Sequence, residues 1–139
     1  MRIIAYCLMP NHWHLLLWPA HDGDLSNFLH WVTGTHAQRF RKATNTVGQG
    51  AVYQARFVAV GVTDLIHLLN VWRYIERNPV QARLVERAEG WPWSSAAHIP
   101  GAPNGLTLDP APVSRPLEWL TIINHEVDPS EVDPSLLAT

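Results

Sequence analysis

Residues 2–18 read RIIAYCLMPNHWHLLLW and contain two apolar stretches that are separated by a short turn. Residues 2–8 are rich in β-branched and apolar side chains, and the Pro10 and Asn11 that follow them favour a turn. The stretch from His12 to Trp18 has the composition of a second strand, which Pro19 ends. We therefore predict a β-hairpin over these residues.

Helical periodicity follows the hairpin. Residues 25–44 and residues 64–78 both place apolar side chains along one stripe. We expect Pro79 to stop the second helix and to start a short one that runs to about Glu86, because proline has no N–H and suits the first helical turn. A strand or bent hairpin is expected over residues 51–62, AVYQARFVAVGV, and a last short helix over residues 117–123. This order predicts an α+β fold, an antiparallel sheet with helices on one face.

Composition excludes several classes of protein. The 139 residues are 47% hydrophobic and 16% charged, which is typical of a soluble domain with one core. Apolar runs such as residues 15–18 are too short to cross a bilayer, and no signal peptide opens the sequence. A single cysteine, Cys7, excludes an internal disulfide framework and a cysteine-rich zinc site. We therefore expect a protein of the reducing cytoplasm.

Charge is distributed unevenly along the chain. The net charge is −2, but residues 39–87 carry eight basic side chains against three acidic ones, a local charge of +5. Residues 88–139 carry a local charge of −6. A basic middle with an acidic end favours binding of a polyanion. Ordinary solvated helix faces are the alternative explanation.

Two histidines in the predicted second strand suggest a metal site. Side chains alternate along a strand, so His12 and His14 point the same way, with Trp13 expected to anchor the opposite face in the core. Two neutral imidazoles in this arrangement can share one divalent cation. Because a lone H-x-H pattern is weak, a structural or surface role for the pair is the alternative.

Tyr74 is placed opposite the apolar stripe of the helix predicted over residues 64–78. Asn78 lies one turn later and points in nearly the same direction, so its amide oxygen could complete a metal site with the histidines. The alternatives are a partly exposed packing residue for Tyr74 and a helix cap for Asn78. In combination, a metal would polarise a phosphodiester and the tyrosine would attack the phosphorus, giving a protein–phosphate ester.

Two blocks of sequence resemble a known family. Residues 5–17, AYCLMPNHWHLLL, closely resemble the HUH block of single-tyrosine transposases of the IS200-like superfamily, the REP-associated branch in particular. A second block, HLL at residues 67–69 with WRYIERNPVQA at residues 72–82, resembles the tyrosine helix of that family. The segments YQARF, residues 53–57, and WPWSS, residues 91–95, are similar to further parts of it.

The resemblance implies a ferredoxin-like domain that cleaves and rejoins single-stranded DNA at hairpin-forming sequences. By similarity, His12 and His14 would bind Mg²⁺ or Mn²⁺, Tyr74 would form a 5′-phosphotyrosine, and Asn78 would match the third metal position. The implied partner is single-stranded or hairpin DNA, with no membrane and with a homodimer left open. Arginine and aromatic side chains suit such a partner. The candidate DNA-binding residues are Arg39, Arg41, Lys42, Arg56, Arg73 and Arg77.

The sequence departs from the family at both ends. Family members usually carry a first strand and helix before the HUH strand, so we expect a partial catalytic domain over residues 1–100 without them. Residues 101–139 are expected to form a Pro-rich, acidic and largely irregular tail. Two other functions remain open: a non-catalytic remnant that binds structured nucleic acid, and a small metal-binding protein. The block around Tyr74 argues against the second, because a metal store needs no tyrosine helix.

Overall fold

A computed structural model of the protein describes residues 1–54, 56–98 and 108–126. Its chain divides into two compact units. Met1 and residues 19–59 form one unit, and residues 2–18 form the other together with the described residues from 60 onward.

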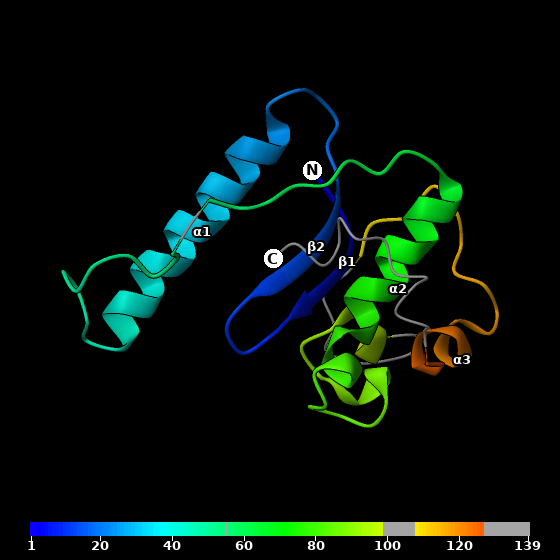
Figure 1. Ribbon diagram of the computed structural model, residues 1–139. Helices are drawn as coiled ribbons and strands as arrows, with labels where there is room; N and C mark the ends of the chain where they lie inside the picture. The colour runs from blue at the N-terminus through cyan, green and yellow to red at the C-terminus, as the bar shows by residue number, and fades with distance from the viewer. Residues whose placement is uncertain (55, 99–107, 127–139) are drawn as a thin grey trace. The chain divides into compact units, whose positions relative to one another are not determined.

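The unit of residues 19–59 is built on one long helix, α1 (Asp24–Ala43), close to the range that periodicity predicts (Figure 1). At the start of the helix, the carboxylate of Asp24 accepts hydrogen bonds from the backbone N–H groups of Ala20 and His21. After the helix, the Arg41 guanidinium donates to the Gln49 and Gly50 carbonyls, at 3.2 and 2.8 Å. These bonds hold the connecting loop against the end of α1.

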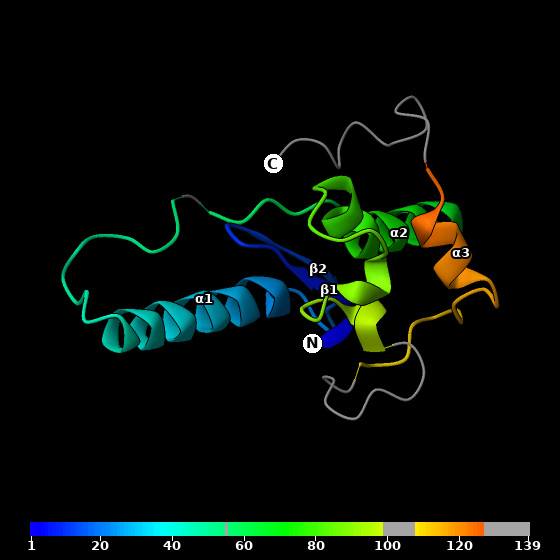
Figure 2. The same ribbon diagram turned by 90° about the horizontal axis from the view of Figure 1, so that it is seen from below.

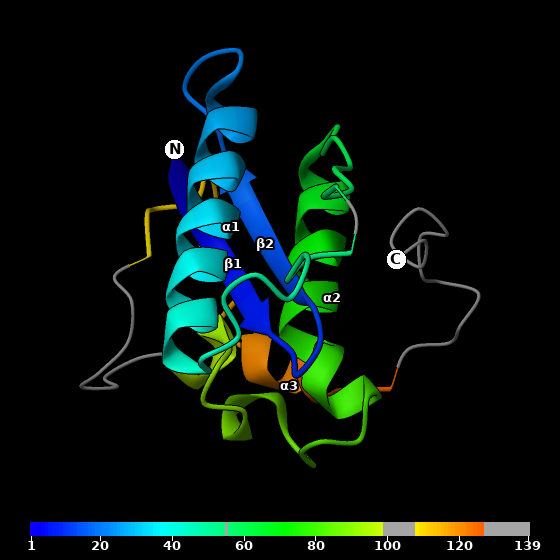
Figure 3. The same ribbon diagram turned by 90° about the vertical axis from the view of Figure 1, so that its left-hand side faces the viewer.

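The second unit contains the hairpin that the sequence predicts. Strands β1 (Arg2–Leu8) and β2 (Trp13–Trp18) pair antiparallel, and a register shift lies between Ile3 and Ala5. The Met9 N–H donates to the His12 carbonyl at 2.9 Å and closes the turn. Helix α2 (Leu65–Gln81) packs against both strands (Figure 3). The α+β class with an antiparallel sheet is therefore confirmed.

Helix α2 does not stop where the sequence predicts. Asp64 caps its start by accepting the His67 N–H at 2.9 Å, but Pro79 lies inside the helix and is fully buried. Only the last turn follows this proline, so few helical hydrogen bonds are affected, and burial of its ring offsets their loss. The chain then reverses at Arg83, with φ of 56°, and the short separate helix predicted from Pro79 to Glu86 is absent from these described residues.

The prediction of a strand or bent hairpin over residues 51–62 is also wrong. None of the described residues in this range belongs to a strand, and Val58 is 72% exposed. High β-propensity stabilises a strand only through pairing with a neighbour and packing on one face. The described part of this segment has neither, so propensity alone was misleading here.

Three short helices complete the second unit: η1 (Ala88–Gly90), η2 (Ser95–His98) and α3 (Trp119–Asn124). Helix α3 packs beside α2 and buries Trp119 and Ile123 in the core (Figure 2). The outer edge of β1 forms backbone hydrogen bonds with residues 93–94 and with Asp109. Residues after 100 thus contribute to the core, while the predicted domain boundary there stays a prediction.

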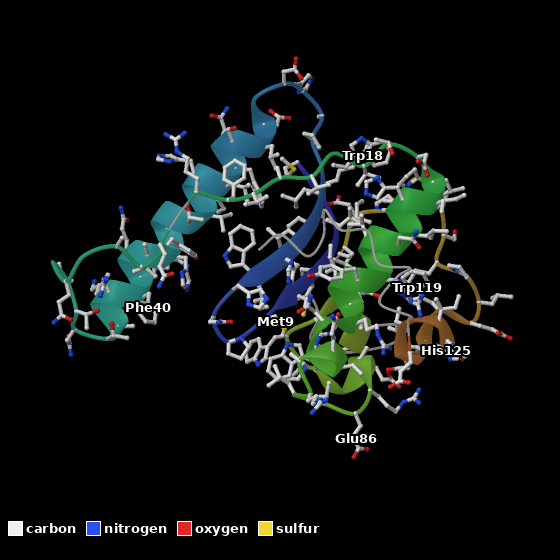
Figure 4. All side chains as sticks on the ribbon, viewed as in Figure 1. Met9, Trp18, Phe40, Glu86, Trp119 and His125 are labelled. Carbon is white, nitrogen blue, oxygen red and sulfur yellow. The ribbon has the colours of Figure 1, made fainter. Side chains whose placement is uncertain are left out.

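One buried carboxylate joins these pieces. Glu76 of α2 is fully buried, and its Oε1 accepts the Ser95 hydroxyl at 2.6 Å and the guanidinium of Arg115. Its Oε2 accepts the indole N–H of Trp119 at 2.6 Å. Figure 4 shows Trp119 between α2 and α3. The indole N–H of Trp72, one helical turn earlier, also donates to Oε1 at 3.1 Å, but the other partners lie 19 to 43 residues away, so no local pattern in the sequence reveals this role of Glu76.

None of the helices in the described ranges is both long and apolar enough to cross a membrane.

Candidate catalytic site

His12 and His14 lie together at the end of the hairpin that is closed by the turn. His14 belongs to β2, and His12 lies one residue before the strand begins. Their ring centroids are 4.9 Å apart, with the planes nearly perpendicular. The two imidazoles thus lie side by side, although His12 lies outside the strand that the sequence predicts to begin with it.

The face of β2 that carries His14 is the one that packs toward the core. Two residues beyond His14 along β2, Leu16 is buried in the core cluster with residues of α2. Trp13 on the opposite face is only half-buried and lies outside that cluster. The expectation that Trp13 anchors the core is therefore wrong, because helix α2 covers the histidine face of the sheet rather than the tryptophan face.

The electrostatic surroundings of His14 favour its neutral form. Burial lowers the pKa of His14 to about 4, and the neighbouring His12 contributes in the same direction. The Nε2 atom of His14 is buried and finds no hydrogen-bond partner among the described residues. A buried nitrogen that carries a lone pair and has no protein partner is suited to bind a cation.

Asn11 orients the other imidazole, a role that sequence analysis missed. Its Oδ1 lies 2.7 Å from His12 Nδ1. If Nδ1 donates this hydrogen bond, the lone pair of His12 resides on Nε2, the nitrogen that remains for a ligand. The signal in the sequence is the Asn directly before the first His, a residue type that also favours a turn.

Tyr74 of α2 contacts one histidine of the pair, His14. Its ring centroid is 5.4 Å from that of His14, in an edge-on arrangement. Tyr74 is half-buried and packs against the core cluster, so it is less exposed than its helical position predicts. The physical reason is that α2 is covered on two sides, by the hairpin and by α3, which leaves a narrower exposed face.

Asn78 lies one helical turn after Tyr74 and is 9% exposed. None of the hydrogen bonds or ring contacts in the described part of the chain joins it to either histidine. Its role as a third metal ligand therefore stays a prediction that rests on its place on the helix.

The donor set fits a divalent cation in part. Two imidazoles lie side by side, one with an unused buried nitrogen, and an amide lies on the adjacent helix. Across the described ranges, no group of three or more His, Cys, Asp or Glu side chains could hold a metal ion. A cation bound here would need oxygen ligands from Asn78, from water or from a phosphate.

The candidate DNA-binding residues fall into two groups. Arg39, Lys42 and Arg56 are exposed. Arg73 and Arg77 reach from α2 to the end of α3, where they donate to the His125 carbonyl at 3.1 Å and to the Ile123 carbonyl at 2.9 Å. Arg41 holds the loop after α1. Three of the six candidates thus bond to backbone carbonyls of the protein itself, and their contribution to DNA binding stays a prediction.

The two other tyrosines have different surroundings. Tyr6 is 5% exposed, and burial raises the pKa of its phenol. Tyr53 shares a hydrogen bond with His36 Nδ1 of α1, at 2.7 Å between the two atoms. Tyr74 is the tyrosine that contacts His14.

The site consists of a hairpin with paired histidines and a helix with a tyrosine that packs across it. Comparison with known proteins points to a class of protein with the same elements. The family model described as IS200-like transposase matches residues 1–78, more than half of the chain. The protein therefore belongs to the IS200-like transposase family.

A relative extends this finding. The chain is 28% identical over 100 residues to a Haemophilus influenzae protein named as a REP-associated tyrosine transposase. The matched part covers 66% of this chain and 57% of that relative, so the chain spans little more than half of the relative's length. No solved structure matches the chain.

Proposed function

We propose that this protein cleaves and rejoins single-stranded DNA at hairpin-forming sequences, with Tyr74 as the nucleophile. The observation that carries the proposal is the continuous contact from His12 to His14 to Tyr74, with ring centroids 4.9 and 5.4 Å apart. A tyrosine ring that contacts one of two adjacent imidazoles suits metal-assisted attack on a phosphodiester.

The covalent step follows from the chemistry of the tyrosine. The Tyr74 hydroxyl oxygen attacks phosphorus, the bond from phosphorus to the 3′ oxygen breaks, and the phenolic proton ends on the departing 3′-hydroxyl. The product is a 5′-phosphotyrosine, which a 3′-hydroxyl can attack in the reverse direction to rejoin the strand. Packing of the Tyr74 ring against His14 restricts the positions that its hydroxyl can take.

We assign the cation-binding role to His12 and His14, with Asn78 as the third ligand, and Mg²⁺ or Mn²⁺ as the ion. When bound there, such an ion would act as a Lewis acid on a phosphate oxygen. Burial keeps His14 neutral at pH 7, because it lowers the pKa of that imidazole to about 4. The hydrogen bond to Asn11 orients His12.

Detection of a covalent adduct tests the proposal. The full chain is incubated with Mn²⁺ and a labelled single-stranded oligonucleotide that forms a hairpin, and the products are separated under denaturing conditions. We expect an adduct from the unaltered protein and none from Tyr74→Phe, which keeps the ring and removes only the hydroxyl. Tyr53→Phe is the matched control, because that phenol also lies beside a histidine. An adduct that persists in Tyr74→Phe would overturn the assignment.

A second function is binding of structured nucleic acid without cleavage. The observation that favours it is the incomplete ligand set, since Asn78 has no described contact with the histidines and no acidic cluster accompanies them in the described ranges. Intact binding of hairpin DNA, without any adduct from the unaltered chain, would support this alternative.

A further inference from the structure

An apolar groove lies beside the hairpin turn that leads to His12. Its volume is about 280 Å³. The residues that line it are Leu8, Met9, Pro10, Trp91 and Trp93. Met9 lies near the closed end of the hairpin (Figure 4). Trp93 is 60% exposed and Leu8 is 42% exposed, so large apolar surfaces face solvent there. Exposed apolar patches of this kind commonly mark binding sites.

Backbone and side-chain bonds fix the groove to the candidate catalytic hairpin. The Leu8 N–H donates to the Trp93 carbonyl at 2.8 Å, and the indole N–H of Trp91 donates to the Leu8 carbonyl at 2.9 Å. On the other side of the turn, the Met9 N–H donates to the His12 carbonyl at 2.9 Å. The groove and His12, the first histidine of the pair, therefore share one hydrogen-bonded turn.

The chemistry of the lining favours a flat, uncharged ring. None of the five residues carries a charge, so the groove offers nothing to a phosphate. Two indoles and a proline present apolar faces, and the indole N–H of Trp91 is already used. Bases of single-stranded nucleic acid stack on such aromatic side chains without regard to sequence.

We propose that this groove is a stacking subsite for one nucleobase of the single strand whose phosphate lies at His12 and His14. The inference rests on the proposed function. Trp93 acts as a positioning residue: by holding a base beside the turn, it places the neighbouring phosphate within reach of the histidine pair. The subsite adds affinity through the base and leaves the ionic contacts of the backbone unchanged.

Two probes separate base stacking from backbone binding. One is a single strand of roughly 12 thymidine nucleotides, within the range that small single-strand binders cover, and the other is an abasic strand of the same length. Binding is measured by fluorescence anisotropy. We expect Trp93→Ala to weaken binding of the thymidine strand about tenfold and to leave binding of the abasic strand unchanged. Trp93→Phe should retain most of the affinity.

The control is Trp31→Ala, because Trp31 of α1 is 65% exposed and contributes nothing to the groove. We expect this variant to bind both strands as the unaltered protein does. The slope of affinity against salt should be the same for Trp93→Ala and the unaltered chain, since stacking releases no counterions. Circular dichroism checks that the Trp93 variants remain folded.

Several outcomes would overturn the inference. Unchanged binding of the thymidine strand by Trp93→Ala would reject the subsite alone and leave the proposed function intact. An equal loss in Trp31→Ala, or an equal loss for the abasic strand, would also reject it. A change of oligomeric state in Trp93→Ala, measured by analytical ultracentrifugation, would show that the groove binds a second copy instead. Failure of the unaltered chain to bind either strand would overturn both proposals.

Discussion

The guanidinium of Arg115 binds the fully buried carboxylate of Glu76, 39 residues earlier in the chain. The same guanidinium lies over the ring of Trp72, 4.5 Å from its centroid. Glu76 is two residues after Tyr74, so this contact supports the helix that carries the candidate nucleophile. Residues 115–124 lie in the tail that the sequence predicts to be largely irregular apart from one short helix, and they help to hold α2 in position.

Arg115→Met should lower the free energy of unfolding by about 1–3 kcal/mol, because it leaves a buried carboxylate with neutral donors only. Urea denaturation followed by tryptophan fluorescence measures the change. Arg83→Met is the matched control, since Arg83 is exposed in the same unit, and its effect should stay within about 0.5 kcal/mol. Equal stability of the two variants would show that the pair with Glu76 contributes nothing.

Binding of a divalent cation should depend on both histidines of the hairpin. His12→Ala and His14→Ala should each weaken Mn²⁺ binding at least tenfold, because the remaining donors hold the ion poorly. Isothermal titration calorimetry gives the affinities. His30→Ala, at an exposed position of α1, serves as the control and should leave them unchanged. Unaltered Mn²⁺ affinity in both hairpin variants would remove the metal site from the proposal.

The stability of the metal-free protein should fall as the pH is lowered from about 6.5 to 4. In this range an unfolded chain protonates His14, whose ordinary pKa is 6.5, whereas burial lowers the pKa in the folded protein to about 4. The unfolded state therefore binds more protons, and stability is lost at about 1 kcal/mol per pH unit or less after solvent screening. Urea denaturation in the presence of a chelator measures this slope.

His14→Leu tests the origin of that slope, because it replaces the titrating imidazole by an apolar side chain of similar size. We expect a flatter dependence of stability on pH between 4 and 6.5 in this variant, and the original slope in His30→Gln. Identical slopes in the unaltered chain and in His14→Leu would mean that other groups cause the loss of stability in acid.

Basic residues should divide into those that bind DNA and those that stabilise the fold. Arg39→Ala and Lys42→Ala, at exposed positions, should each reduce the slope of log affinity against log salt by about 1 when single-stranded DNA is bound. Arg77→Ala should instead lower the unfolding free energy, because it removes a bond to the Ile123 carbonyl. Fluorescence anisotropy between about 50 and 200 mM salt separates the two effects. A slope that none of these changes alters would contradict a phosphate-binding face.

Local patterns in the sequence predicted the elements that carry the site. Alternation along the predicted strand placed His12 and His14 on one face, and helical periodicity located α1 and α2. The short helix expected over residues 117–123 lies within two residues of α3. These features repeat over two to four residues, so each is contained in a short stretch of chain. The roles of the site residues remain predictions.

Other features depended on contacts between distant parts of the chain. Burial keeps Pro79 inside α2, and the lack of a described partner strand leaves the described residues of the range 51–62 without β-structure despite their composition. Burial also lowers the pKa of His14, and the Glu76–Arg115 pair joins two segments that no local pattern connects. Such contacts have no fixed spacing in the sequence. Packing of the whole unit creates them, because the free energy of a buried charge or an unused polar atom depends on everything that surrounds it.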